Sequence, residues 1–143
     1  MATSKKADDQ ADQVFLPVAE GEEPWTAEEI AEQRAELEAE IARLREVVAE
    51  GEAELSELMS EGSDSTGRDP ADVGSSNYER DQELSLHQNQ IAMLYQTEQA
   101  LELLNEGGYG VCENCGKPIG KLRLQAFPRA TMCKACKQRQ ERR

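Results

Sequence analysis

The chain has 143 residues, of which 31% are charged and 4% aromatic, and its formal net charge is −13 at pH 7. One Trp, two Phe and three Tyr cannot fill a large globular core, so we expect one small domain or a small domain with appendages. No apolar run approaches the ~18 residues of a membrane span, and the N-terminus has no apolar secretory signal. These features predict a soluble, cytoplasmic protein.

The charge is distributed unevenly along the chain. Residues 1–111 carry 27 acidic and 7 basic side chains, whereas residues 112–143 carry 2 acidic and 9 basic ones. The acidic residues 1–111 should not be attracted to nucleic acid, although the basic residues 112–143 could be. We therefore expect a partner that also presents both signs of charge.

The first predicted region is an N-terminal tail, residues 1–25, that is polar, acidic and almost without aromatic residues. Such a composition favours disorder, because it offers too little apolar surface to offset the entropy of ordering. A short apolar stretch at residues 14–18 interrupts the tail. We interpret this stretch as part of a disordered tail rather than as a docking segment.

A helix is predicted to begin at Ala27 and to run to about Met59. Thr26 and Glu29 have the spacing of a capping box, and Trp25 and Ile30 that of a hydrophobic staple. The apolar positions then follow alternating steps of three and four, which is typical of a coiled-coil seam. The seam has two lapses, Arg34 and Gly51, and its apolar members are Ile30, Leu37, Ile41, Leu44, Val48, Leu55 and Leu58.

A predicted loop at residues 60–76 is rich in Gly, Ser and Thr and contains one Pro. A second helix should follow from about Asn77 to Glu106, where Gly107 and Gly108 stop it. Two helices of matched length joined by a loop pack most simply as an antiparallel coiled-coil hairpin, here residues 26–107. Pairing between two chains is the alternative. The apolar positions of the second helix are Leu84, Ile91, Leu94, Leu101 and Leu104.

The four cysteines of the chain form two C-x-x-C pairs with seventeen residues between them, namely Cys112, Cys115, Cys133 and Cys136. Two such pairs make a tetrahedral cage of four thiolates, the pattern of a structural zinc site. Two disulfides would need an oxidising compartment, and a thioredoxin-like site would need a βαβ unit that the sequence lacks. An iron–sulfur centre remains an alternative for the same ligands. We expect one structural Zn²⁺ and no open coordination position, and hence no metal-dependent catalysis.

The predicted C4 zinc-finger module spans residues 108–143 and ends in a basic segment. Its expected small core consists of Val111, Ile119, Leu122, Leu124, Phe127 and Met132. The fold class is therefore mainly α, with a coiled-coil hairpin, a zinc module and a disordered tail. Basic side chains give the module a positive surface that we interpret as a partner-binding surface: Lys117, Lys121, Arg123, Arg129 and Lys137.

The segment Tyr109-Gly-Val-Cys-Glu-Asn-Cys-Gly-Lys-Pro-Ile-Gly120, followed by Leu-Gln-Ala-Phe-Pro at 124–128 and the second cysteine pair, resembles the DksA/TraR family of bacterial transcription factors. The resemblance extends over about residues 26–140 and is most specific in the zinc module. It implies a transcription regulator that inserts its hairpin into the secondary channel of RNA polymerase. We also expect a monomer that needs no membrane and reads no DNA sequence.

The family carries an Asp-x-x-Asp-x-Ala signature at the hairpin tip. Here Asp69 and Asp72 match the two aspartates, and Gly74 stands where the family has Ala. The resemblance implies that these residues act near the polymerase active centre, where carboxylates can perturb a magnesium site without catalysing a reaction. Glycine should make the tip more flexible.

Some family members bind guanosine tetraphosphate through basic side chains. The corresponding positions here hold Asn89, Gln96 and Phe127, and only Lys137 keeps its charge. A polyphosphate needs several Lys or Arg donors, so we expect alarmone potentiation to be weak or absent.

Two other functional classes compete with the polymerase regulator. A nucleic-acid-binding zinc ribbon or a coiled-coil adapter could use the basic zinc module, but the net acidity and the lack of interleaved aromatic residues argue against nucleic acid. An enzyme is not expected, since the sequence shows no nucleophile, open metal site or phosphate loop. His87, the single histidine, is interpreted as a helix-packing residue.

Overall fold

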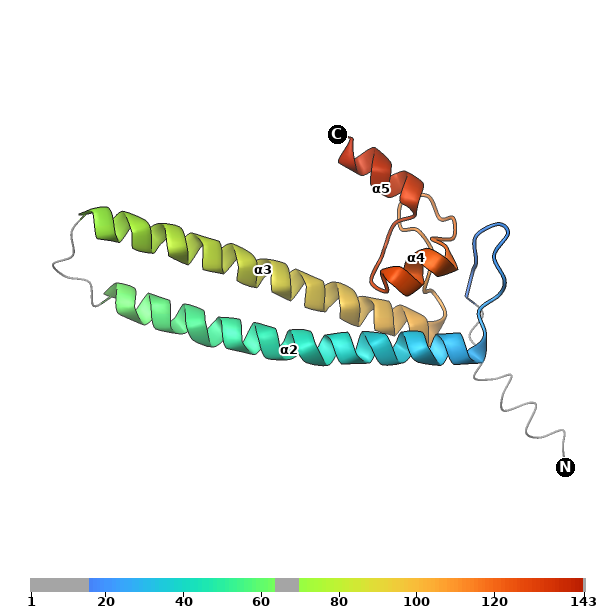
Figure 1. Ribbon diagram of the computed structural model, residues 1–143, viewed down its shortest axis with the longest axis horizontal. Coiled ribbons are helices and arrows are strands. Elements are labelled where there is room, and N and C mark those ends of the chain that lie inside the picture. The colour runs from blue at the N-terminus through green and yellow to red at the C-terminus, as the bar shows by residue number, and fades with distance from the viewer. Residues whose placement is uncertain (1–15, 64–69, 143) are drawn as a thin grey trace, which may run out of the picture. The chain divides into compact units, whose positions relative to one another are not determined.

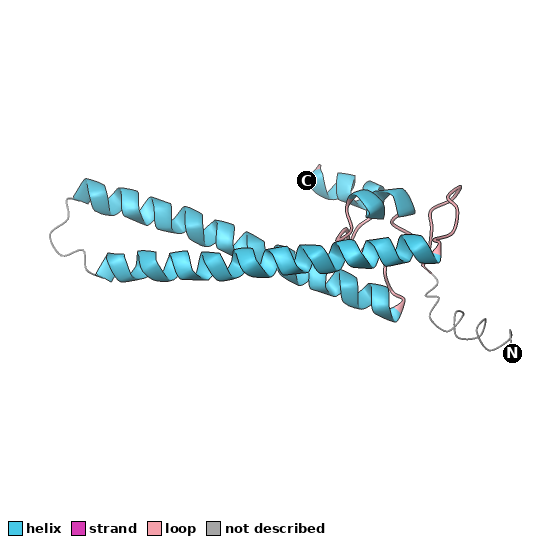
Figure 2. Ribbon diagram, turned by 60° about the horizontal axis from the view of Figure 1, so that its bottom comes forward, coloured by secondary structure: helices cyan, strands magenta, loops and turns pink. Residues whose placement is uncertain are grey.

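A computed structural model describes residues 16–63 and 70–142, except for the side chains of 61–63, 70–73 and 76. The described residues form four helices: α2 (Ala27–Ser63), α3 (Pro70–Glu106), α4 (Lys121–Ala126) and α5 (Lys134–Glu141) (Figure 1). The described residues contain no strand (Figure 2). They contain only an isolated antiparallel bridge between Val111 and Pro118. The mainly α fold class is confirmed. Within the described residues no helix is long and apolar enough to cross a membrane.

The predicted start of α2 is confirmed by its capping box. The Thr26 N–H donates to Glu29 Oε1 at 3.0 Å, and the Glu29 N–H donates to Thr26 Oγ1 at 3.1 Å. The end of α3 is also as predicted, because the N–H groups of Gly107 and Gly108 both donate to the carbonyl of Leu103. Gly107 has φ of +98°, a conformation that favours glycine after a helix.

The chain divides into two compact units, which we describe separately. The zinc unit comprises Met1–Ala39 with Thr97–Arg143, and the hairpin unit comprises Glu40–Gln96. In each unit, α2 and α3 run antiparallel within one chain, as Figure 1 shows.

The predicted seam of α2 is confirmed, but that of α3 is wrong in part. On α2, Ile30, Leu37, Ile41, Leu44 and Leu55 are buried. On α3, the predicted seam residues Leu84 and Ile91 are 37% and 42% exposed, because each stands one residue after a seam position. One residue of an α-helix is a rotation of about 100°. The buried positions of α3 are His87, Thr97, Ala100 and Leu104, so its seam is more polar than the apolar pattern suggests.

The predicted loop of residues 60–76 is too long. Helix α2 continues to Ser63, and α3 begins at Pro70. Proline suits the first helical position, since its φ is already helical and its missing N–H would have no helical partner there. Gly74 lies within α3, where one glycine costs about 1 kcal/mol relative to alanine but does not end a helix.

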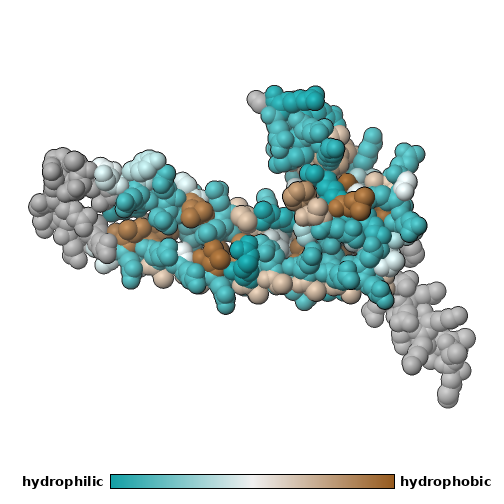
Figure 3. Space-filling model, in the orientation of Figure 1, coloured by the Kyte–Doolittle hydropathy of each residue, from teal (hydrophilic) through white to brown (hydrophobic). Residues whose placement is uncertain are grey.

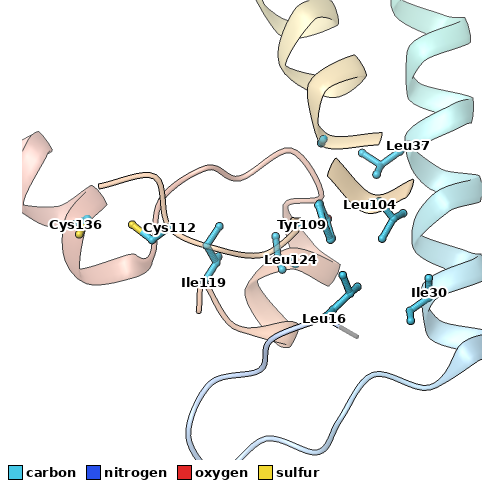
Figure 4. Packing of buried hydrophobic residues seen from close by; sticks show 10 residues of the cluster. Leu16, Ile30, Leu37, Leu104, Tyr109, Cys112, Ile119, Leu124 and Cys136 are labelled. Atoms are coloured by element: carbon cyan, nitrogen blue, oxygen red, sulfur yellow. The ribbon is translucent and has the colours of Figure 1, made fainter. Parts of the chain in front are cut away.

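The core of the zinc unit contains residues from near both ends of the described chain, from Leu16 to Cys136 (Figure 4). Leu16 is 8% exposed and packs in this cluster, so the prediction that residues 1–25 are disordered is wrong from residue 16 onward. The rest of that predicted tail lies outside the described residues. The cluster comprises Leu16, Ile30, Leu37, Ala100, Leu104, Tyr109, Cys112, Ile119, Leu124 and Cys136.

Candidate metal centre and partner-binding residues

The four cysteine sulfurs gather at one point of the zinc unit. All four Sγ atoms lie within 4.8 Å of one another, and the Sγ atoms of Cys115 and Cys133 are 3.8 Å apart. A tetrahedral zinc site with Zn–S bonds of ~2.3 Å has sulfur–sulfur edges of ~3.8 Å. The four thiols therefore fit one zinc ion in a closed, all-sulfur site.

The first cysteine pair lies on a tight turn. The Gly116 N–H donates to the Cys112 carbonyl at 2.9 Å, and the Cys112 N–H donates to the Lys117 carbonyl at 2.8 Å. Gly116 has φ of +75°, which side chains of L-residues rarely allow. This turn directs both thiols of the pair to one side.

The second cysteine pair lies at the start of α5. Cys133 is the N-cap residue of this helix, and Cys136 lies in its first turn. The Lys137 N–H donates to the Cys133 carbonyl at 3.0 Å, so the basic segment after Cys136 begins within α5. Three residues make almost one helical turn, so the two thiols share a face.

The pKa values of the metal-free thiols diverge. Burial raises the pKa of Cys112, but hydrogen bonds from the backbone N–H groups of Cys115, Cys133 and Asn114 outweigh it and lower the pKa to about 6. For Cys115, the Lys117 N–H lowers the pKa, but burial and the three neighbouring sulfurs raise it to about 11. Four thiolates this close repel one another, so full ionisation requires a cation at the centre.

Two side chains that sequence reasoning missed donate to a metal-site sulfur. Asn114 Nδ2 lies 3.4 Å from Cys136 Sγ, and Arg139 Nη2 lies 3.7 Å from the same atom. Such donors orient a ligand and offset the negative charge of a four-thiolate site. The spacing of Arg139, three residues after Cys136 on a helix, is the signal that could have suggested it.

A buried polar network connects α2 to the segment before the first cysteine pair. Gln33 is 3% exposed, and its Nε2 donates to the Tyr109 hydroxyl at 2.8 Å and to the Leu124 carbonyl. The Tyr109 hydroxyl donates to the Pro128 carbonyl at 2.6 Å. Burial raises the pKa of Tyr109 to about 12, so the hydroxyl stays a donor.

Glu22 caps helix α4 from a distant part of the sequence. Its carboxylate accepts hydrogen bonds from the N–H groups of Lys121 and Leu122 at 2.9 and 3.0 Å, and from the Ala19 N–H at 2.9 Å. The N-cap residue Gly120 has no side chain to do this. The Leu122 N–H is the main reason that the pKa of Glu22 is lowered.

The basic side chains predicted to bind a partner differ in availability. Lys121 Nζ lies 2.6 Å from Glu29 Oε1 and 5.9 Å from the centre of the Trp25 ring, so it is already engaged. Arg123 donates to the Met132 carbonyl at 3.2 Å. By contrast, Lys117 and Lys137 are exposed, and Arg129 is half-buried.

The predicted tip residues are described only in part. Asp69 lies outside the described residues, and Asp72 is described only by its backbone in α3. Gly74 is exposed, and a Cβ there would have no atom within 4 Å. Of the positions compared with the alarmone site, Asn89, Gln96 and Phe127 are all exposed.

Comparison with known proteins supports the sequence-based resemblance. Residues 107–142 match the family model of the prokaryotic DksA/TraR C4-type zinc finger. Together with the sulfur geometry, this match assigns the four cysteines to one structural Zn²⁺.

Similarity extends beyond the zinc module. The chain is 37% identical over 103 residues to the RNA polymerase-binding transcription factor DksA of Caulobacter vibrioides, covering 72% of this chain and 71% of that protein. It is 33% identical over 69 residues to DksA of Escherichia coli, covering 48% and 46%. The solved structure of transcription factor DksA2 from Pseudomonas aeruginosa matches with a TM-score of 0.64 and 31% identity, covering 81% of this chain and 85% of that one.

Proposed function

Because the chain belongs to the DksA/TraR family, we propose that it is a transcription regulator that binds RNA polymerase directly. The single observation that carries this proposal is the similarity to DksA over 72% of the chain, a much longer stretch than the zinc-finger match at residues 107–142. The relatives compared above are named as transcription factors, which accords with a role without catalysis.

In this proposal the hairpin, residues 26–107, enters the secondary channel of the polymerase with residues 69–74 foremost. Asp69 and Asp72 then bring two carboxylates near a magnesium-containing active centre, where they change the local electrostatics. The many exposed glutamates of α2 suit a channel lined with basic side chains.

The zinc module, residues 108–143, contacts the outside of the polymerase. Among the basic residues predicted to bind a partner, Lys117 and Lys137 are exposed and available for an acidic surface on the partner. Lys121 and Arg123 are less available, because they already contact Glu29 and the Met132 carbonyl within the zinc unit. Arg129 contributes through its exposed part. The regulator acts as a monomer and reads no DNA sequence.

The proposal is tested by gel filtration of the zinc-loaded protein with RNA polymerase core from the same organism, followed by in vitro transcription. We expect co-migration of both the parent and the Asp69→Asn/Asp72→Asn variant, with transcription altered only by the parent. A matched control, Glu79→Gln/Asp81→Asn, removes two exposed carboxylates of α3 outside the signature and should behave as the parent.

The possible failures separate the parts of this proposal. Absence of co-migration would exclude direct binding and leave the adapter or nucleic-acid-binding alternatives. A nucleic-acid binder would instead show DNA affinity that falls steeply with salt. Co-migration with equal activity of parent and tip variant would retain polymerase binding and exclude the role of the tip aspartates.

A further inference from the structure

Residues 16–24, which precede α2, form a strap on the zinc unit. Leu16 is 8% exposed and belongs to the same buried cluster as two of the four cysteines. The strap turns at its centre, where the Ala19 N–H donates to Glu22 Oε1 at 2.9 Å and the Glu22 N–H donates to the Ala19 carbonyl at 3.1 Å. The segment therefore has a defined conformation and is anchored in the core.

The strap lies against the base of the loop that carries the first cysteine pair. A backbone hydrogen bond of 2.8 Å to the Gly110 carbonyl closes this loop, residues 110–120. A Cβ at Gly110 would lie 3.8 Å from Pro17 Cγ, and a Cβ at Gly120 would lie 3.7 Å from the Ala19 Cβ. Both ends of the loop are thus glycines, and the strap contacts both of them.

The strap also fixes the segment between the two cysteine pairs. Glu22 accepts hydrogen bonds from the N–H groups of Lys121 and Leu122 at the start of α4, the helix that follows the loop and precedes the second pair. Four thiolates must converge on one ion, so a shift of either pair weakens a tetrahedral site. The strap therefore restrains the position of one pair relative to the other.

The four cysteines differ in how deeply they are buried. Cys112 and Cys136 are 1% and 2% exposed, whereas Cys115 is exposed and Cys133 is partly exposed. A chelator can reach the two accessible sulfurs directly. The two buried sulfurs become accessible only when the packing around them opens. That packing is the buried cluster to which Leu16 belongs.

We propose that the strap controls how fast Zn²⁺ leaves the zinc unit, by holding the two buried thiolates in place after the two accessible ones have been attacked. The strap and the ion then stabilise each other, because a coupling between two sites is reciprocal. The proposal concerns only residues 16–24 and the cysteine site, and it does not depend on polymerase binding.

The test measures zinc release from the full-length, zinc-loaded protein into an excess of a chromogenic chelator. We expect Glu22→Ala to release Zn²⁺ about fivefold faster than the parent, which corresponds to the ~1 kcal/mol of a lost helix cap. Leu16→Ala should also release it faster, since the change opens the buried cluster. Glu23→Ala alters an exposed strap residue and should match the parent.

A variant in the hairpin unit separates control of the zinc site from a general loss of stability. Leu55 is 8% exposed and lies outside the buried cluster of the zinc unit, so Leu55→Ala should destabilise the hairpin and leave zinc release unchanged. Reciprocity is measured by hydrogen exchange, which chelation should speed at the N–H groups of Ala19 and Glu22.

Three results would each overturn the proposal. The first is a release rate of the parent that neither Glu22→Ala nor Leu16→Ala increases. The second is an equal increase in Leu55→Ala, which would make release a matter of overall stability. The third is exchange at the Ala19 and Glu22 N–H groups that chelation leaves unchanged.

Discussion

At the scale of single residues, two glycines in long helices have opposite surroundings. A Cβ at Gly51 would come within 2.7 Å of the buried His87 ring, whereas one at Gly74 would have no atom within 4 Å. In the sequence the two positions look alike, because each is a glycine within a long helical segment. Only the packing around each decides what a methyl group would do there.

We predict that Gly74→Ala stabilises the protein and that Gly51→Ala does not. Alanine in a helix gains about 1 kcal/mol over glycine, and at Gly74 nothing opposes this gain. At Gly51, forcing a methyl group against a packed ring costs about 1–3 kcal/mol. Thermal unfolding measures both, and a Tm of Gly51→Ala as high as that of Gly74→Ala would contradict the packing argument.

Gly74→Ala also restores the residue that the family has at this position, so it bears on the tip. Alanine should reduce the flexibility of the backbone near Asp72. If the proposed function holds, this variant regulates transcription at least as strongly as the parent.

Glu22 is a second residue whose role depends on folding. Glu22→Ala removes the acceptor for the Lys121 and Leu122 N–H groups, and we expect a loss of about 1 kcal/mol, as for other capping residues. The neighbouring Glu23→Ala is the control, because Glu23 is exposed. Equal Tm values for the two variants would show that Glu22 contributes no more than a surface carboxylate.

At the scale of elements, the first turn of α2 and helix α4 stabilise each other through the ion pair of Glu29 with Lys121. Lys121 is the main reason that the pKa of Glu29 is lowered to about 2, with the Thr26 N–H next. A lowered pKa in the folded state means that the ionised carboxylate stabilises the fold. The ionised Glu29 therefore stabilises the contact between α2 and α4.

This pairing predicts acid sensitivity with a defined sign. The contribution of Glu29 should be complete above its ordinary pKa of 4.5 and should be lost as the pH falls toward about 2. Glu29→Gln keeps an N3 side chain that can cap but loses the charge. Its Tm deficit relative to the parent should shrink over this pH range. A deficit that stays constant would contradict the assignment.

The zinc module should depend on its ion far more than the hairpin unit does. Cys112 and Cys136 are part of the zinc-unit core, whereas no metal-site cysteine lies in residues 40–96. Chelation should therefore speed hydrogen exchange in residues 109–141 and leave residues 40–60 and 80–96 nearly unchanged. Zinc affinity should decrease as the pH is lowered, because thiols must lose protons to bind the ion. Equal acceleration in both units would show that they unfold together.

At the scale of the whole molecule, the acidic and basic parts of the sequence are separated. The basic residues concentrate after Cys112, yet Lys121 and Arg123 have partners within the zinc unit. The number of cations free to meet a partner is therefore smaller than the sequence count. This favours a protein partner with a local acidic surface over a polyanion that needs many contacts.

The same scarcity of cations leads to a prediction about the alarmone. Guanosine tetraphosphate should add little to regulation by this protein, since Asn89, Gln96 and Phe127 offer no positive charge. In vitro transcription with and without the alarmone measures this effect. The double variant Asn89→Lys/Gln96→Arg should gain a response. Strong synergy with the parent protein would contradict the prediction.

The sequence alone was sufficient for the start of α2, the end of α3 and the zinc ligands, because their signals are local. The capping box at Thr26, the Gly107 stop and two C-x-x-C pairs each depend on residues a few positions apart. The zinc site was predictable because metal chemistry accepts few ligand sets and spacings.

Tertiary structure decided the features that depend on residues far apart in the chain. Glu22 caps α4 across about a hundred residues, Gln33 reaches Tyr109, and His87 occupies the space left by Gly51. The polar seam of α3 also became visible only in the fold, because burial depends on what the facing helix presents and not on hydrophobicity alone. Long-range contacts leave no fixed spacing in a sequence, which is why only packing reveals them.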